Sequence, residues 1–405
     1  MNFGIKPYRR FKMANNENSI VKEHKIFALT TDPIYIGTGG YTIGRVDNTI
    51  VRDPITKVPK IPGSSLAGVW RYYVTLNIFS KIKNIKPKRE EVLKQTGNSI
   101  AEKIEGWINN NSNNWNTSNY YHFKGNVLLD LNCAGQDNVP QEELANITAT
   151  NKEGKTGHCG HCLVCKGFGF SKKDISWQGM IFFSDLNILF FPVFTIYGTK
   201  WTTTVGKLKE AGIKPDDLNE PPNNEVLTKN GNEGHINLGW LYLKVGGTHS
   251  VRLNNEIKFE NFELRDTDII IVPESLFSRI VNSNLEVRTS VSIDPNTGAA
   301  KEGALFTSEA IPRGTILYGN VRIFDKTSFS GVDSKLDPLP NLNTLESALM
   351  ESKHFFETLG IGGMTTRGFG RIKIIFGKVL EEKSIPTVES NFQDTQQTTA
   401  QGGKQ

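Results

Sequence analysis

The sequence predicts an α+β fold built on a ferredoxin-like sheet of the RNA-recognition type. A β-branched, apolar stretch over residues 24–36 enters a glycine-rich loop, and a helix is expected over residues 64–81. Near the other end, a helix over residues 342–359 stops at Gly360 and precedes a strand over residues 368–379. A strand–helix unit at each end, with long segments between them, indicates a sheet core that carries insertions.

The helix expected over residues 64–81 starts at Ser64 and Ser65, which are typical N-cap residues. Its large apolar residues recur at helical spacing and form one stripe: Leu66, Val69, Trp70, Tyr73 and Ile78. This stripe predicts that the helix packs against the sheet.

The segments between the two units alternate between polar insertions and core strands. Residues 82–165 are rich in lysine and asparagine and are predicted to form a first insertion, whereas residues 177–194 are apolar and read as buried strands. Residues 202–258 are expected to form a second insertion, after which residues 259–272 and 287–291 return to strand character.

Composition supports one large folded domain, which we expect to span residues 24–380. The chain has 405 residues, of which 37% are hydrophobic, while residues 381–405 are polar and are predicted to be a disordered tail. A net charge of +5 permits a polyanionic partner. No apolar run approaches the roughly 20 residues that span a bilayer, and no hydrophobic signal segment opens the chain. We therefore expect a soluble, cytoplasmic protein without a membrane partner.

The cysteines point to a metal site in the first insertion. The chain has four of them: Cys133, Cys159, Cys162 and Cys165. The last three recur at every third position, which is typical of metal ligation rather than of disulfides, and zinc is the usual occupant. Cys133, His158 and His161 compete as the fourth ligand, and Cys133 is favoured because its use leaves no free thiol. Four protein ligands would make this zinc structural.

Two glycine-rich loops have the composition of phosphate-binding segments. The first, residues 37–54, places Asp47 between two arginines and leads into a helix start whose free N–H groups suit a phosphate. The second, residues 360–371, has five glycines among twelve residues, more than a helix end and a turn require. The residues predicted to contact RNA are Arg45, Arg52, Lys60, Ser64, Ser65, Arg71, Gly362, Gly363, Arg367 and Arg371.

Three aspartates stand in turn-like contexts. Asp53 and Asp294 each precede a proline and are predicted to initiate turns. By residue type alone, Asp47 is expected to be a loop aspartate that caps a turn or pairs with Arg45.

Four segments together carry a family resemblance. In chain order they are residues 46–54, 61–68, 287–309 and 360–371. They resemble the motifs of the RAMP superfamily of CRISPR proteins, and the similarity covers roughly residues 24–80, 158–200 and 285–378. The chain departs from the frequent family pattern at Tyr35, where histidine is common, and at Ala67, where lysine is common.

The resemblance implies a backbone subunit of a type III CRISPR effector, with a thumb-like hairpin at about residues 285–320. It further implies that Asp47 is the catalytic residue of target-RNA cleavage by attack of the 2′-OH, assisted by a divalent cation such as Mg²⁺. The implied partners are guide RNA, complementary target RNA, related RAMP proteins and a large polymerase/cyclase-like subunit.

Two other functions fit the same residues less well. A non-catalytic scaffold that binds guide RNA is compatible with Tyr35 in place of the frequent histidine. A stand-alone ribonuclease that processes guide RNA would need a catalytic histidine. The seven histidines are scattered, and His158 and His161 belong to the cysteine cluster.

Overall fold

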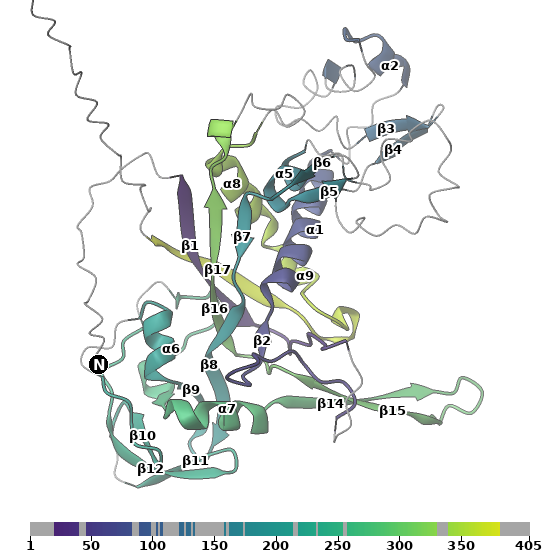
Figure 1. Ribbon diagram of the computed structural model, residues 1–405. Helices are drawn as coiled ribbons and strands as arrows, with labels where there is room; N and C mark the ends of the chain where they lie inside the picture. Colours follow the sequence, from purple (N-terminus) through teal and green to yellow (C-terminus); the bar gives the residue numbers. More distant parts are fainter. Residues whose placement is uncertain are drawn as a thin grey trace, which may run out of the picture.

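The computed structural model describes residues 20–39, 46–82, 89–98, 103, 106–107, 121–124, 127–130, 133, 158, 162–172, 175–213, 218–231, 234–253, 257–329 and 339–380. Within these ranges, eleven strands form one mixed sheet (Figure 1). They are β1 (Val21–Thr30), β2 (Lys60–Ile61), β7 (Ile181–Phe183), β8 (Leu186–Thr195), β9 (Gly198–Thr203), β10 (Glu225–Thr228), β11 (His235–Leu238), β12 (Leu241–Thr248), β13 (Ile269–Ile271), β16 (Ile316–Phe324) and β17 (Ile372–Leu380).

The main path of the sheet runs β11-β12-β10-β13-β9-β8-β16-β1-β17, with β2 paired to β8 and β7 paired to β16. Further strands form two-stranded pairs: β3 (Tyr121–Lys124) with β4 (Val127–Asp130), β5 (Phe170–Lys172) with β6 (Ile175–Trp177), and β14 (Glu286–Ile293) with β15 (Ala300–Ala310). The helices are α1 (Gly63–Ile82), α2 (Arg89–Leu93), α5 (Leu163–Phe168), α6 (Val205–Glu210), α7 (Glu274–Ser283), α8 (Leu342–Ser352) and α9 (Phe355–Thr358), with short 3₁₀ turns η3 (Asp266–Asp268), η4 (Thr327–Phe329) and η5 (Thr365–Arg367). No described helix is long and apolar enough to cross a membrane.

The sheet is buried on both faces, because its strands supply alternate side chains to two separate cores. In β1, Ile26 and Ala28 belong to one hydrophobic cluster, and Phe27 and Leu29 belong to the other. The first cluster also contains the buried faces of α1, α7 and α8, and the second contains that of α6. The predicted α+β class is confirmed, while the finer ferredoxin-like arrangement stays a prediction.

Helix α1 is fixed across the sheet by its apolar stripe. Trp70 is fully buried, and its indole N–H donates to Ser352 Oγ at 3.1 Å and to the Leu349 carbonyl oxygen at 3.3 Å on α8. A buried tryptophan needs such a partner for its one polar atom. The helix begins at Gly63, so Ser64 and Ser65 lie in its first turn rather than before it.

One predicted element is divided in the structure, and the other is found as predicted. The strands expected over residues 177–194 include β7 and β8, and between them Ser184 Oγ accepts from the Asn320 N–H at 2.8 Å while Asp185 Oδ1 accepts from the Gly63 N–H at the start of α1. The helix expected over residues 342–359 forms α8 and α9, separated at Lys353 and His354.

The two predicted insertions differ in how they join the sheet. Residues 202–258 contain α6 and strands β10, β11 and β12, and these strands extend the main sheet beyond β13. The described parts of residues 82–165 contain α2 and the β3–β4 pair, and α5 begins at Leu163. Residues 381–405, predicted to be a disordered tail, lie outside the described residues.

Strands β14 and β15 form a long hairpin that projects from the body of the molecule (Figure 1). Its turn is closed at Asp294, whose carboxylate accepts from the Asn296 N–H at 2.8 Å. The turn predicted at Asp294 is therefore confirmed. Along the hairpin several apolar side chains face solvent, among them Val287, Val291 and Leu305.

Candidate functional site

The loop that carries Asp47 lies against the base of the β14–β15 hairpin. The Asp47 Oδ2 atom accepts from the backbone N–H of Thr307 at 2.7 Å and from the Thr307 hydroxyl at 3.0 Å. The next residue, Asn48, forms a parallel β-bridge with Ser308. Its N–H donates to the Thr307 carbonyl oxygen and its carbonyl oxygen accepts from the Glu309 N–H, both at 3.0 Å. Asp47 thus binds the hairpin rather than capping a turn of its own loop, and the pair with Arg45 stays a prediction because Arg45 lies outside the described residues.

The Asp47 carboxylate is exposed and held in its ionised form. The Thr307 backbone N–H and hydroxyl stabilise the negative charge and lower the pKa of Asp47 below its ordinary value. In the described part of the chain, the second oxygen of this carboxylate, Oδ1, has no hydrogen-bond partner. An exposed carboxylate with one oxygen fixed and one open can accept a proton or help to hold a cation.

The arginines predicted to flank Asp47 have different outcomes. Arg45 lies outside the described residues. The guanidinium of Arg52 donates to Asn282 Oδ1 at 2.8 Å, to the Ile50 carbonyl oxygen at 3.0 Å and to Glu309 Oε2 at 2.8 Å. These contacts join the loop to α7 and β15, so Arg52 holds the loop in place with its charge already paired.

Lys60 and the start of α1 form a second charged group. Lys60 Nζ lies 3.2 Å from Asp53 Oδ2 and 2.6 Å from Asp185 Oδ2, and Asp185 foremost raises the pKa of Lys60. Asp185 Oδ1 also accepts from the Gly63 N–H at 2.8 Å, so a protein carboxylate already faces the positive end of the helix. Ser64 is exposed and Ser65 half-buried beside it.

Asp53 forms the turn that its sequence predicted. Its Oδ1 atom accepts from the backbone N–H groups of Ile55 at 3.0 Å and Thr56 at 2.9 Å. These bonds, the one from Thr56 foremost, lower the pKa of Asp53 to about 2.

The C-terminal glycine-rich loop packs on Tyr35, just before the first loop. The Gly363 N–H donates to the Tyr35 carbonyl oxygen at 2.9 Å. Gly362 has φ +87°, and a Cβ there would lie 2.2 Å from the Tyr35 carbonyl oxygen, so only glycine permits this approach. Arg371 pairs with Asp32, whereas the Arg367 side chain is exposed and has no partner among the described residues.

Arg288 joins the hairpin to the C-terminal glycine-rich loop. It donates to the Gly368 carbonyl oxygen at 3.0 Å, and its guanidinium lies 4.7 Å from the centre of the Phe369 ring. The two glycine-rich loops and the hairpin base therefore form one junction, which we call the three-segment junction: residues 33–37 with 46–53, residues 286–288 with 307–309, and residues 360–371. Sequence reasoning missed Thr307 and Arg288, although both lie in the segment 287–309, because each acts through a partner that is distant in the sequence.

Three of the four cysteines form a buried cluster. The Sγ atoms of Cys133, Cys162 and Cys165 lie within 4.8 Å of one another. The Cys165 N–H donates to Cys162 Sγ at 3.4 Å, a contact that stabilises a thiolate at the start of α5. Thiolates at this spacing could hold a metal ion. Cys159 and His161 lie outside the described residues.

Arg71, which is predicted to contact RNA, lies beside this cluster. Its Nε–H donates to the Cys133 carbonyl oxygen at 2.9 Å, and its terminal nitrogen lies 2.9 Å from His158 Nδ1. Because arginine only donates, His158 Nδ1 must accept, and in the neutral ring the proton resides on Nε2. The same Nδ1 atom lies 3.9 Å from Cys165 Sγ, so His158 borders the cluster with its lone-pair nitrogen already bound by Arg71.

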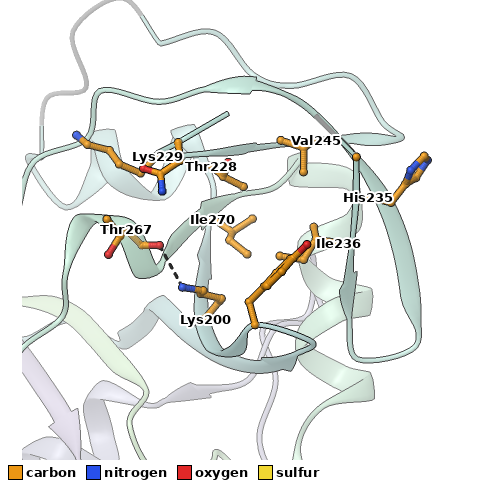
Figure 2. A pocket seen from close by; sticks show the side chains of 11 residues that line it. Lys200, Thr228, Lys229, His235, Ile236, Val245, Thr267 and Ile270 are labelled. Carbon is orange, nitrogen blue, oxygen red and sulfur yellow. Dashed lines mark hydrogen bonds between the residues drawn. The ribbon is translucent and has the colours of Figure 1, made fainter. Parts of the chain in front are cut away.

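A cavity of about 250 Å³ lies away from these residues, between β9, β11, β12 and β13 (Figure 2). Its floor includes Ile236 and Ile270, and its rim includes two lysines. Lys200 pairs with Asp268 at 2.7 Å and Lys229 lies 3.9 Å from Asp266, so the positive charges at the rim are balanced. The cavity therefore has no excess of charge that would favour a phosphate.

Comparison with known proteins gives one family match. The model of the RAMP superfamily matches residues 28–373. None of the curated proteins compared with the chain matches it.

Several solved structures align with most of the chain. A chain of the type III-B Cmr-beta complex in its apo state is 13% identical, with 87% of this chain and 96% of that chain covered and a TM-score of 0.45. A chain of the same complex bound to cognate target RNA is 14% identical, with coverage of 87% and 96% and a TM-score of 0.44. Oligomeric Cmr4 from Pyrococcus furiosus is 18% identical, with coverage of 89% and 99% and a TM-score of 0.44.

Proposed function

The chain belongs to the RAMP superfamily, and from that premise we propose that it is a guide-RNA-binding backbone subunit of a type III CRISPR ribonucleoprotein that cleaves complementary target RNA at Asp47. The observation that carries this proposal is the position of Asp47 in the three-segment junction. Its carboxylate is exposed and ionised, and it is fixed by Thr307.

Target RNA supplies its own nucleophile in this reaction. The 2′-oxygen attacks the adjacent phosphorus, the bond from phosphorus to the 5′-oxygen breaks, and the products are a 2′,3′-cyclic phosphate and a 5′-hydroxyl. The proton lost by the 2′-OH is taken up by a base, and the leaving 5′-oxygen gains one. Asp47 has no basic partner among the described residues, and its Oδ1 is suited to accept a hydrogen bond from the 2′-OH and direct the proton.

A divalent cation such as Mg²⁺ would supply charge stabilisation to the phosphorane-like transition state. Magnesium is commonly held by one or two carboxylates together with phosphate oxygens. Among the described residues of the junction, Asp47 is the carboxylate that is not paired with a lysine or an arginine, whereas Asp53, Glu286 and Glu309 are. The low pKa of Asp47 suits this role, because a weakly basic carboxylate stays ionised.

Guide RNA is proposed to run along the three-segment junction and the start of α1. Arg367 offers an exposed charge. Gly362 and Gly363, which pack against Tyr35, remain proposed RNA contacts. Ser64 and Ser65 remain proposed phosphate contacts. The structure favours positioning roles for Arg52, Lys60 and Arg71, whose polar atoms are bound within the protein.

The remaining features of the proposal follow from the family. The β14–β15 hairpin would act as the thumb, and related RAMP proteins and a polymerase/cyclase-like subunit would be neighbours in a cytoplasmic complex. Zinc would be held by Cys133, Cys162 and Cys165 with Cys159 as the fourth ligand, in a structural role.

The test uses the reconstituted complex with guide RNA and complementary target RNA. Asp47→Asn removes the charge at constant size, and we expect cleavage to fall by about 100-fold or more with unchanged target binding. Asp325→Asn is the matched control, because Asp325 lies outside the junction and its turn contact, from the Thr327 N–H to Oδ1 at 2.8 Å, can be kept by an amide oxygen; this variant should cleave normally. Unchanged cleavage by Asp47→Asn would instead support the non-catalytic scaffold.

A further inference from the structure

We propose that Thr307 is the positioning residue of Asp47, and that through it the β14–β15 hairpin sets the place of the cleaving carboxylate; this inference rests on the proposed function. Thr307 belongs to β15, far from Asp47 in the sequence. It is the residue through which the described part of the hairpin binds that carboxylate.

Thr307 and Asp47 are joined by three hydrogen bonds, which run in both directions. The Thr307 hydroxyl donates to Asp47 Oδ2 at 3.0 Å and accepts from the Asp47 backbone N–H at 3.1 Å, while the Thr307 N–H donates to Oδ2 at 2.7 Å. A hydroxyl can donate and accept at once, so the Thr307 hydroxyl fixes both the carboxylate and the backbone N–H of Asp47. An apolar residue of the same shape would lose two of these three bonds.

The neighbouring residues make the hairpin and the loop one unit. Asn48 donates its backbone N–H to the Thr307 carbonyl oxygen and accepts from the Glu309 N–H, both at 3.0 Å. Glu309 in turn pairs with Arg52 of the same loop at 2.8 Å. A displacement of β15 is therefore passed to Asp47 through direct bonds and does not need a chain of packed side chains.

The projecting part of the hairpin is accessible to a ligand that could displace β15. Beyond its base, β14 and β15 pair only with each other among the described strands, and they project from the sheet (Figure 1). Side chains that face solvent include Val287, Val291, Ile293 and Leu305. RNA that engages the hairpin would thus act on the geometry of the carboxylate as well as on affinity.

The experiment compares Thr307→Val with Thr307→Ser in the reconstituted complex. Valine keeps the shape and the backbone N–H but lacks the hydroxyl, and we expect the single-turnover cleavage rate to fall about 10- to 100-fold at unchanged target affinity. Serine keeps the hydroxyl and should restore the rate to within about threefold. Thr289→Val is the matched control, because Thr289 is exposed and lies directly across the hairpin from Thr307.

Hydrogen exchange of the isolated protein gives a readout that does not depend on cleavage. Thr307→Val should increase exchange over residues 46–50, whereas Thr307→Ser and Thr289→Val should not. Unchanged exchange in Thr307→Val, or serine as poor as valine, overturns the inference. If Asp47→Asn abolishes cleavage but Thr307→Val does not slow it, the proposed function stands and this inference fails. If Asp47→Asn has no effect, the proposed function fails, and exchange alone decides whether Thr307 positions the loop.

Discussion

The two arginines of the C-terminal loop were both predicted to contact RNA, but they have different surroundings in the structure. Arg371 forms an ion pair with Asp32, which raises the pKa of its guanidinium, whereas Arg367 is exposed and unpaired within the described ranges. A paired arginine must give up its partner before it binds a phosphate. Arg367 has no such cost, so it is the stronger candidate for RNA contact.

We therefore expect Arg367→Ala to weaken guide-RNA binding and to flatten its salt dependence by about 0.7 in the slope of log K against log salt, the value for one phosphate on a single strand. Arg371→Ala should leave that slope unchanged, because the Arg371 guanidinium is already paired with the Asp32 carboxylate. Binding of labelled guide RNA across a salt series measures both. A flatter slope for Arg371→Ala alone would reverse the assignment.

At the residue scale, sequence reasoning located candidates better than it assigned their partners. Asp53 and Asp294 form the turns that their Asp-Pro contexts predicted. Lys60 and Arg71 looked like free basic residues, yet they bind Asp185 and the cysteine cluster through contacts far along the chain. Such pairings depend on tertiary structure and leave no local pattern.

At the scale of elements, the C-terminal glycine-rich loop shows why sequence identifies a loop but not its neighbour. Five glycines predicted an unusual backbone, and Gly360, Gly362, Gly368 and Gly370 do have positive φ. What the loop approaches is the Tyr35 carbonyl oxygen, more than 300 residues away in the chain. The predicted helix and strand on either side were found, with the helix divided into α8 and α9.

A matched pair of glycines tests this packing. Gly362→Ala should destabilise the protein by about 1–2 kcal/mol for the left-handed backbone and by a further roughly 1–3 kcal/mol for the clash with Tyr35. Gly198 has the same φ of +87°, but a Cβ at that position would meet nothing within 4 Å, so Gly198→Ala should cost the backbone part alone.

Urea denaturation of both variants gives the free energies of unfolding. Equal losses for Gly198→Ala and Gly362→Ala would show that close approach to Tyr35 adds nothing.

At the scale of the whole molecule, the cysteine cluster joins parts that are distant in sequence. Cys133 lies beside α5, and Arg71 of α1 binds the Cys133 carbonyl oxygen. The sequence predicted the ligand types, and three of them meet in the structure. It did not predict that residues 202–258 would extend the main sheet, because short polar strands resemble loops until their partners are known.

Zinc content tests how the cluster is completed. We expect about one zinc ion per chain, with Cys133→Ser and Cys159→Ser losing most of it. His158→Ala should retain zinc, because His158 Nδ1 accepts from Arg71. Metal analysis of the purified variants, with thermal unfolding before and after chelation, measures occupancy and its effect on stability. Loss of zinc from His158→Ala with retention in Cys159→Ser would assign the fourth ligand to the histidine.

The place of β1 in the sheet has a consequence for synthesis of the chain. Strand β1, at Val21–Thr30, pairs on one side with β16 and on the other with β17, which ends at Leu380. A ribosome therefore makes almost the whole domain before its first strand can find either neighbour. Contacts of such long sequence separation fold slowly, and an unpaired apolar strand is exposed to aggregation meanwhile. Until β16 has been made, β1 lacks both of the strands that flank it in the folded domain.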